Sequence, residues 1–251
     1  MLKKIQSLLS QNFCSWDPQV KAFNNFYDEL IKSEVYLRLA KEIQGHPTPA
    51  YNLATPDLYA DLETHCEQRT GSFCDIGCGL GVLSHFTPKH PLTAWDFSQS
   101  ALDFAKSQTP HHNFFLHHQN IGLPTVHKNI SHKVAIDSLY PSNNRQPANK
   151  YFEDTLVKLL KGNTQSLYVV QNFGVPPHLC PKGFDLQTLD LTDSFRSLIS
   201  SWKNLLQSEE VKEDAKKFPL LWSTIEREFS QHQRSLNEKP LKRLRLLFTK
   251  T

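Results

Sequence analysis

A short run with glycine at alternate positions, residues 73–81, constrains the fold of this chain more than any other stretch. Its sequence is FCDIGCGLG, and Val82, Leu83 and Phe86 follow it at helical spacing. This pattern predicts a buried strand, a tight turn and the start of a helix. Glycine accepts a positive φ and lets another group lie against the backbone. The N-terminus of the helix that follows favours a negative group such as a carboxylate.

Spacing distinguishes this loop from two common nucleotide-binding loops. A dinucleotide loop requires G-x-G-x-x-G, but Val82 stands where the third glycine would be. A P-loop requires G-x-x-x-x-G-K-[ST], and no Lys-Ser or Lys-Thr pair follows here. The remaining pattern, D-I-G-C-G-L-G, resembles motif I of the class I S-adenosylmethionine (SAM) methyltransferases. The resemblance implies a cofactor-binding role for five residues: Asp75, Gly77, Cys78, Gly79 and Gly81.

An acidic residue, Asp96, ends the next apolar run. In related α/β folds, a carboxylate at the end of the second strand accepts both hydrogen bonds of a ribose diol. Phe97 follows it and is expected to pack on the adenine face, or else in the core. A glycine-rich turn with a chance surface aspartate would give the same sequence pattern. The glycine loop and the acidic strand end together nevertheless favour a SAM site.

The resemblance also implies roles for two later segments. Asn120 and Ile121 follow the predicted third strand, where the family usually has an aspartate that accepts a hydrogen bond from the adenine amino group. The side-chain carbonyl of Asn120 can accept that bond without a charge. Asp137 and Tyr140 follow the fourth strand, and ligands of open parallel sheets lie at the carboxyl ends of strands. We therefore expect both near the transferred methyl group, as the candidate catalytic residues.

Asp137 is expected to orient either a cationic amine or the methionine ammonium of the cofactor, and Tyr140 to hydrogen-bond the acceptor. The segment I-D-S-L-Y at 136–140 resembles the fourth-strand end of some small-molecule methyltransferases. It is not the N/D-P-P-Y/F signature of enzymes that methylate exocyclic amines of nucleobases, which counts against a DNA adenine methylase.

Composition narrows the class of protein. At 251 residues the chain is long enough for one large α/β domain with an additional lobe. A net charge of +3 is too small to indicate nucleic acid or an anionic membrane as a partner. Five cysteines without a C-x-x-C pair predict reduced thiols, a cytoplasmic location and no metal site. No run of about 18 apolar residues occurs, and the first residues lack the apolar core of a signal peptide, so no membrane role is expected.

The pattern along the chain predicts an α/β fold, a seven-stranded Rossmann-like class I methyltransferase sheet with its last strand antiparallel. Apolar runs that alternate with helical patterns indicate a parallel sheet covered on both faces. Two domains are expected, an N-terminal helical cap over residues 1–70 and a SAM-binding domain over 71–251. The second contains a helical insertion at about 192–238, between the sixth and seventh strands. The predicted strands cover residues 72–76, 92–97, 113–117, 134–136, 166–171, 184–191 and 243–246.

Two charged stretches are interpreted as surface. Glutamate, aspartate and lysine alternate over residues 209–217, which predicts a solvated face. The basic cluster of Lys239, Lys242, Arg243 and Arg245 has a period of two with leucines between. That period indicates a half-exposed last strand in preference to a nucleic-acid patch.

Five residues are candidates for contact with the acceptor. Tyr51 and Tyr59 border the third predicted helix and are expected to roof the site, although the cap could equally be a packing appendage. Trp202 and His232 come from the insertion, where core packing is the alternative. His178 follows the fifth strand, and either histidine could act as a general base or have a purely structural role.

These features together predict a methyltransferase that moves a methyl group from SAM to a small-molecule acceptor by in-line displacement. S-adenosylhomocysteine (SAH) would be the product. Two alternatives stay open from the sequence: a non-catalytic SAM- or SAH-binding protein, and an RNA or protein methyltransferase. The acceptor atom, the pathway and the oligomeric state are not encoded in any pattern found.

Overall fold

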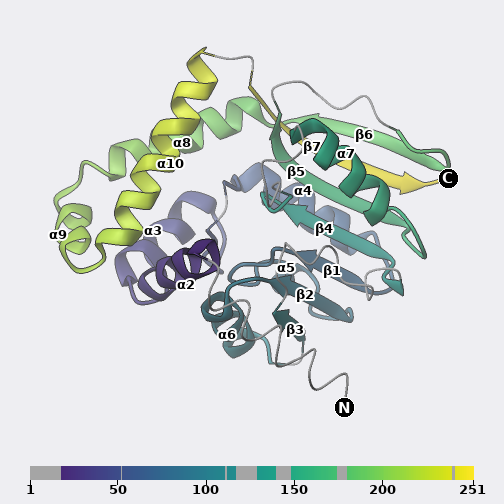
Figure 1. The fold of residues 1–251 in the computed structure, drawn as a ribbon, viewed down its shortest axis with the longest axis horizontal. Helices are drawn as coiled ribbons and strands as arrows, with labels where there is room; N and C mark the ends of the chain where they lie inside the picture. The colour runs from purple at the N-terminus through teal and green to yellow at the C-terminus, as the bar shows by residue number, and fades with distance from the viewer. Residues whose placement is uncertain are drawn as a thin grey trace.

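The computed structural model describes residues 18–51, 53–110, 112–116, 129–139, 148–173, 180–238 and 241–251. Seven strands form one sheet in the order β3-β2-β1-β4-β5-β7-β6 (Figure 1). β7 runs antiparallel to both of its neighbours, whereas the pairs among β1 to β5 are parallel. The predicted fold class is confirmed. The strands are Phe73–Ile76 (β1), Leu92–Asp96 (β2), Asn113–Leu116 (β3), His132–Ile136 (β4), Ser166–Phe173 (β5), Phe184–Asp190 (β6) and Lys242–Lys250 (β7).

Successive residues of a strand point to opposite faces of the sheet, and nearly all residues of the central strands β1 and β4 are buried, so helices cover both faces there. Helix α7 (Ala148–Leu159) packs with Ala135 and Val169 on one face. Helix α4 (Pro56–Glu67) packs with Val134 and Tyr168 on the other (Figure 1). The third helix of the predicted cap therefore covers a face of the sheet and is part of its core.

The glycine loop leads into a short helix at the place that the sequence pattern predicts. Helix α5 (Leu83–Phe86) has only four residues. Pro88 follows Thr87 directly, and the residue before a proline is driven away from helical geometry. A single turn has little aligned dipole, and the attraction of an anion to this helix N-terminus stays a prediction. Helix α6 (Gln99–Gln108) is regular, with Ser98 as its N-cap.

Two N-terminal helices precede α4. Helix α2 covers Pro18–Leu30 and helix α3 covers Glu34–Gln44. The hydroxyl of Ser33 caps α3, and Gly45 ends it in the left-handed conformation. Thr55 caps α4.

Three helices lie between β6 and β7: α8 (Thr192–Leu205), α9 (Glu209–Lys217) and α10 (Pro219–Glu238). They share one apolar cluster with α2 and α3, and the five helices gather beyond the carboxyl ends of the parallel strands (Figure 1). The solvated face predicted for 209–217 is wrong at one residue. Asp214 is buried, and its carboxylate accepts hydrogen bonds from Ser33 Oγ and, at 2.9 Å, from Trp222 Nε1.

The arginines of β7 correct the prediction of a half-exposed last strand. Arg243 is 1% exposed and Arg245 is 9% exposed, since β7 lies between β5 and β6 and is covered on both faces. Each guanidinium forms a bidentate ion pair, Arg243 with Asp137 at 2.6 and 2.7 Å and Arg245 with Asp61 at 2.9 and 3.0 Å. Lys242 is exposed, whereas Lys239 lies outside the described residues.

Two further observations concern the described residues as a set. None of their helices combines the length and the apolar character needed to cross a bilayer. Cys66, Cys74 and Cys78 are buried thiols and Cys180 is an exposed one, and none of these four forms a disulfide.

Candidate functional site

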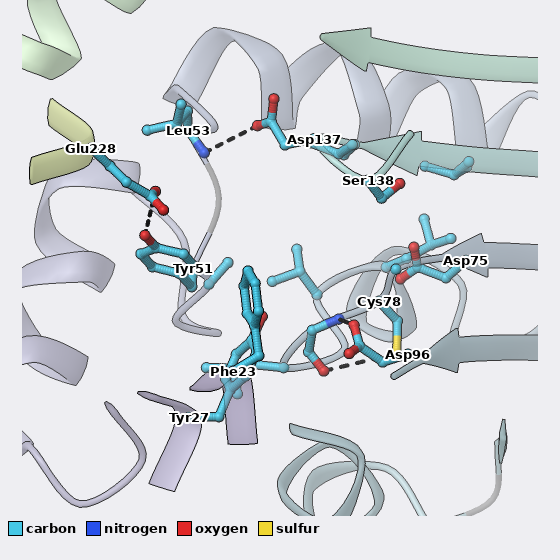
Figure 2. A pocket seen from close by; sticks show the side chains of 18 of the residues that line it. Phe23, Tyr27, Tyr51, Leu53, Asp75, Cys78, Asp96, Asp137, Ser138 and Glu228 are labelled. Atoms are coloured by element: carbon cyan, nitrogen blue, oxygen red, sulfur yellow. Dashed lines mark hydrogen bonds between the residues drawn. The ribbon is translucent and has the colours of Figure 1, made fainter. Parts of the chain in front are cut away.

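A cavity of about 340 Å³ lies between the carboxyl edge of the sheet and the helices of the cap and insertion. Figure 2 shows it from close by, with Asp75, Cys78 and Asp96 on the side of the strands and Tyr51 and Glu228 on the side of the helices. The residues that line it fall into two groups. At the strand end they include Asp75, Gly77, Cys78, Gly79, Asp96 and Ser138. At the helical end they include Tyr36, Tyr51, Trp202, Glu228, Phe229 and His232.

The glycine loop forms the strand end of this cavity. Gly77 has a φ of +71°, and a Cβ there would lie 2.4 Å from Ser138 Cβ, so the loop packs directly on the end of β4. Gly81 has a φ of +82°, and its added Cβ would lie 2.9 Å from Ala105 Cβ of α6. Gly81 therefore serves packing and does not line the cavity, whereas Gly77 and Gly79 do.

Asp96 holds this loop in place from the end of β2. Its Oδ2 accepts a hydrogen bond from Gly79 N at 2.8 Å, and its Oδ1 accepts one from Ser98 N at 2.8 Å. Burial raises the pKa of Asp96, and the bonds from Ser98 and Gly79 oppose that rise. Each carboxylate oxygen has a second lone pair, so the side chain keeps capacity to accept a hydrogen bond from a ligand in the cavity.

Two further polar groups lie beside the loop. Burial, followed by the negative charge of Asp96, raises the pKa of Asp75 to about 8. The hydroxyl of Ser138, at the end of β4, is buried and has no hydrogen-bond partner among the described residues. Buried polar groups are nearly always satisfied, so an orphaned hydroxyl on a cavity wall indicates a place where a ligand binds.

Asp137 also lines the cavity, but its carboxylate already has partners. Arg243 binds both of its oxygens, and Leu53 N donates a further hydrogen bond at 3.3 Å. Arg243 in turn donates to Asn172 Oδ1 at 3.3 Å and lies 5.0 Å from the ring centroid of Phe195. Asp137 has a φ of 50°, an uncommon conformation for a residue with a side chain. The pair fixes the end of β4 relative to β7.

The helical end of the cavity combines aromatic rings with a second carboxylate. The hydroxyl of Tyr51 donates a hydrogen bond to Glu228 of α10 (Figure 2). The Trp202 ring lies 5.4 Å from the Phe229 ring and 5.7 Å from the Tyr36 ring, between centroids. Burial raises the pKa of Glu228, and the bond from Tyr51 and the charge of Arg227 oppose that rise.

His232 lies one turn further along α10 and also faces the cavity. Its Nδ1 lies 3.4 Å from Asn172 Nδ2, and burial lowers its pKa, so the imidazole is neutral near neutral pH. A neutral imidazole beside a cavity can accept or relay a proton.

Comparison with known proteins identifies the fold. No family model and no curated protein sequence matches the chain. Among solved structures, the cyclopropane synthase MmaA2 from Mycobacterium tuberculosis aligns with a TM-score of 0.65 and 12% identity over 93% of this chain and 99% of that one. The chain has the class I methyltransferase fold.

Two other solved structures share this fold. Phosphoethanolamine N-methyltransferase 2 from Haemonchus contortus, in complex with SAM, aligns with a TM-score of 0.60 and 12% identity, over 90% of this chain and 60% of that one. The [4+2]-cyclase SpnF aligns with a TM-score of 0.57 and 14% identity over 91% of this chain and 94% of that one. Since one class I methyltransferase fold carries a cyclase activity, function has to be argued from the site.

Only some of the predicted site residues line the cavity. Tyr59 does not line the cavity, because it lies on α4 and its ring packs 4.9 Å from His46 and 5.8 Å from Phe86. Four predicted residues lie outside the described part of the chain: Asn120, Ile121, Tyr140 and His178. Those that line the cavity are Asp75, Gly77, Cys78, Gly79, Asp96, Phe97, Asp137, Tyr51, Trp202 and His232.

Three contributors to the site were missed by sequence reasoning. Arg243 was interpreted as surface because its strand alternates basic and apolar residues. Glu228 is three residues after Ile225 and four before His232, so it shares their helix face, and that spacing was a usable signal. Phe23 of α2 lines the cavity and packs edge-on against Phe97, with ring centroids 4.9 Å apart.

Proposed function

We propose that this protein is a SAM-dependent methyltransferase that acts on a small-molecule acceptor. One observation carries the proposal. The Asp96 carboxylate holds the glycine loop through Gly79 and faces a cavity that continues to an aromatic second end. A nucleoside-binding carboxylate and an adjoining space for a second molecule are the two requirements of such an enzyme.

The residues of the strand end fit the cofactor. Asp96 would accept the hydrogen bonds of a ribose diol, and Phe97 would pack against the adenine. Gly77 and Gly79 expose backbone without side chains, and the Ser138 hydroxyl offers an unused donor. Asn120 and Ile121 stay predicted contacts of the adenine. The SAM complex of a phosphoethanolamine N-methyltransferase with the same fold supports SAM as the ligand.

When bound, SAM supplies a methyl group on a sulfonium, and the protein's share of the chemistry is positioning. The Arg243 pair holds Asp137 at the carboxyl end of β4, beside the junction of the two ends of the cavity. Helices α2, α3, α8 and α10 contribute to the wall, so an acceptor would be shielded from water on several sides. A cavity of about 340 Å³ is within the usual range for small-molecule sites, which favours a small acceptor over a nucleic acid or a protein.

Calorimetric titration with SAH tests the proposal. The wild-type protein should bind SAH, and Asp96→Ala should weaken binding at least tenfold, about 1.4 kcal/mol, because a buried bidentate acceptor is lost. Asp103→Ala is the matched control, since Asp103 is exposed on α6. No SAH binding by the wild type, or equal binding by the Asp96 variant, would contradict the cofactor assignment.

A further inference from the structure

The helical end of the cavity has a chemical character of its own. Four aromatic side chains line it, contributed by α3, α8, α10 and the segment before α4, together with one glutamate, Glu228. Figure 2 shows Glu228 beside Tyr51. The rings are those of Tyr36, Tyr51, Trp202 and Phe229. Aromatic faces carry partial negative charge and attract cations at short range.

The two carboxylates near this end, Asp137 and Glu228, differ in their partners. Asp137 is neutralised by the bidentate contact with Arg243, so this cation is already committed. Among the residues that the structure describes, no lysine or arginine lies within ion-pair distance of Glu228. Its hydrogen-bond partner is the neutral hydroxyl of Tyr51, so within the described ranges the carboxylate forms no ion pair, and Arg227 acts on it only from a longer distance.

We propose that the acceptor is a small amine, which enters as an ammonium ion held between Glu228 and the aromatic rings and leaves with one more methyl group on nitrogen. This inference rests on the proposed function and names its substrate class. A carboxylate or phosphate acceptor would be repelled by Glu228, and a neutral alcohol or phenol would leave the charge of the glutamate uncompensated in a partly buried wall.

The transfer balances with groups present in the cavity. The ammonium gives one proton to the Glu228 carboxylate, whose raised pKa suits it to accept one. The nitrogen lone pair then forms the new bond to the methyl carbon while the carbon–sulfur bond breaks and its electron pair stays on sulfur. Tyr51, Arg227 and Asp137 are the groups that act on Glu228, and the neutral His232 lies one turn away on the same helix.

The test compares a cation with an uncharged molecule of the same shape. Choline, a methylated ammonium, and dimethylbutanol, in which carbon replaces the quaternary nitrogen, are titrated by calorimetry into the full chain, both ligand-free and saturated with SAH. Choline should bind at least about tenfold more tightly than dimethylbutanol. Glu228→Gln keeps a hydrogen-bond acceptor for Tyr51 but removes the charge, and should abolish most of that preference.

Glu226→Gln is the matched control, because Glu226 is exposed on the same helix, and it should keep the wild-type preference. Absence of choline binding, equal binding of the two probes, or an undiminished preference in Glu228→Gln would overturn the amine inference. SAH binding without a choline preference leaves the proposed function standing. Failure of SAH to bind would overturn the proposed function, while the ligand-free titration would still decide the charge preference of the cavity.

Discussion

At the scale of single residues, the site depends on how closely the glycine loop approaches the ends of β2 and β4. Gly77 packs on Ser138, and Gly79 donates its N–H to Asp96. Both glycines have positive φ values, which residues with a Cβ adopt only at a cost. The loop is thus held in the shape that leaves the Asp96 carboxylate facing the cavity.

Comparison of Gly77→Ala with Gly183→Ala separates the effect of close packing from the effect of backbone strain. The added Cβ would meet Ser138 Cβ at 2.4 Å, whereas at Gly183, with a similar φ of +83°, it would meet nothing within 4 Å. Gly77→Ala should therefore lower the free energy of unfolding by about 1–3 kcal/mol more than Gly183→Ala does. Urea denaturation of both variants measures the difference, and equal losses would mean that the loop does not pack on β4 as described.

Asp75 should make stability depend on pH. Its folded-state pKa of about 8 lies above the ordinary value of 3.8, so the folded protein holds this proton more tightly than the unfolded chain. The stabilisation that protonated Asp75 contributes at low pH is then lost as the pH rises from about 4 to about 8. Asp75→Asn removes this titration. The free energy of unfolding of the variant, relative to that of the wild type, should therefore increase by at least about 1 kcal/mol across that range. A difference that stays constant with pH in denaturation experiments would contradict the assignment.

At the scale of elements, one buried carboxylate connects the insertion to the cap. Asp214 of α9 accepts hydrogen bonds from Ser33, the N-cap of α3, and from Trp222 of α10. Helix α3 therefore meets the consecutive helices α9 and α10 of the insertion at one carboxylate. Hydrogen bonds to charged groups are among the stronger ones in proteins.

Asp214→Ala should destabilise this junction. Loss of the carboxylate leaves the Ser33 hydroxyl and the Trp222 indole N–H without their acceptor, which should lower the free energy of unfolding by about 2–4 kcal/mol. Glu213→Ala, at an exposed neighbouring position of α9, should change it by no more than about 0.5 kcal/mol. Chemical denaturation compares the two variants, and similar small effects would show that Asp214 does not join the helices.

At the scale of the whole molecule, the cap and the insertion form one apolar body over the carboxyl edge of the sheet. Phe26, Leu30 and Leu39 from the N-terminal helices pack in the same cluster as Trp202 and Ile225 from the insertion. This arrangement encloses the helical end of the cavity with residues that are far apart in the sequence, such as Leu39 and Trp202. A shared core of this kind couples the stability of the cap helices to that of the insertion.

Sequence patterns predicted the strands, the glycine loop and Asp96, since each depends on neighbours within a few residues. They failed where long-range topology decides. The arginines of β7 resemble a surface strand, and only its position between β5 and β6 buries Arg243 against Asp137. The prediction that Tyr59 roofs the site depends on a helix that lies over the cavity, and it is wrong because α4 covers the sheet. Glu228 shares a helix face with Ile225 and His232, so its spacing indicates an inward position, but only tertiary packing brings it beside Tyr51.

The central claim is that the cavity at the carboxyl edge binds SAM with its acceptor at the helical end. A crystal structure of the full chain with SAH tests this most directly. We predict the ribose hydroxyls within hydrogen-bond distance of Asp96, the adenine beside Phe97, and the sulfur turned toward the end that holds Glu228. Density for SAH elsewhere on the protein, or a ribose that does not contact Asp96, would contradict the claim.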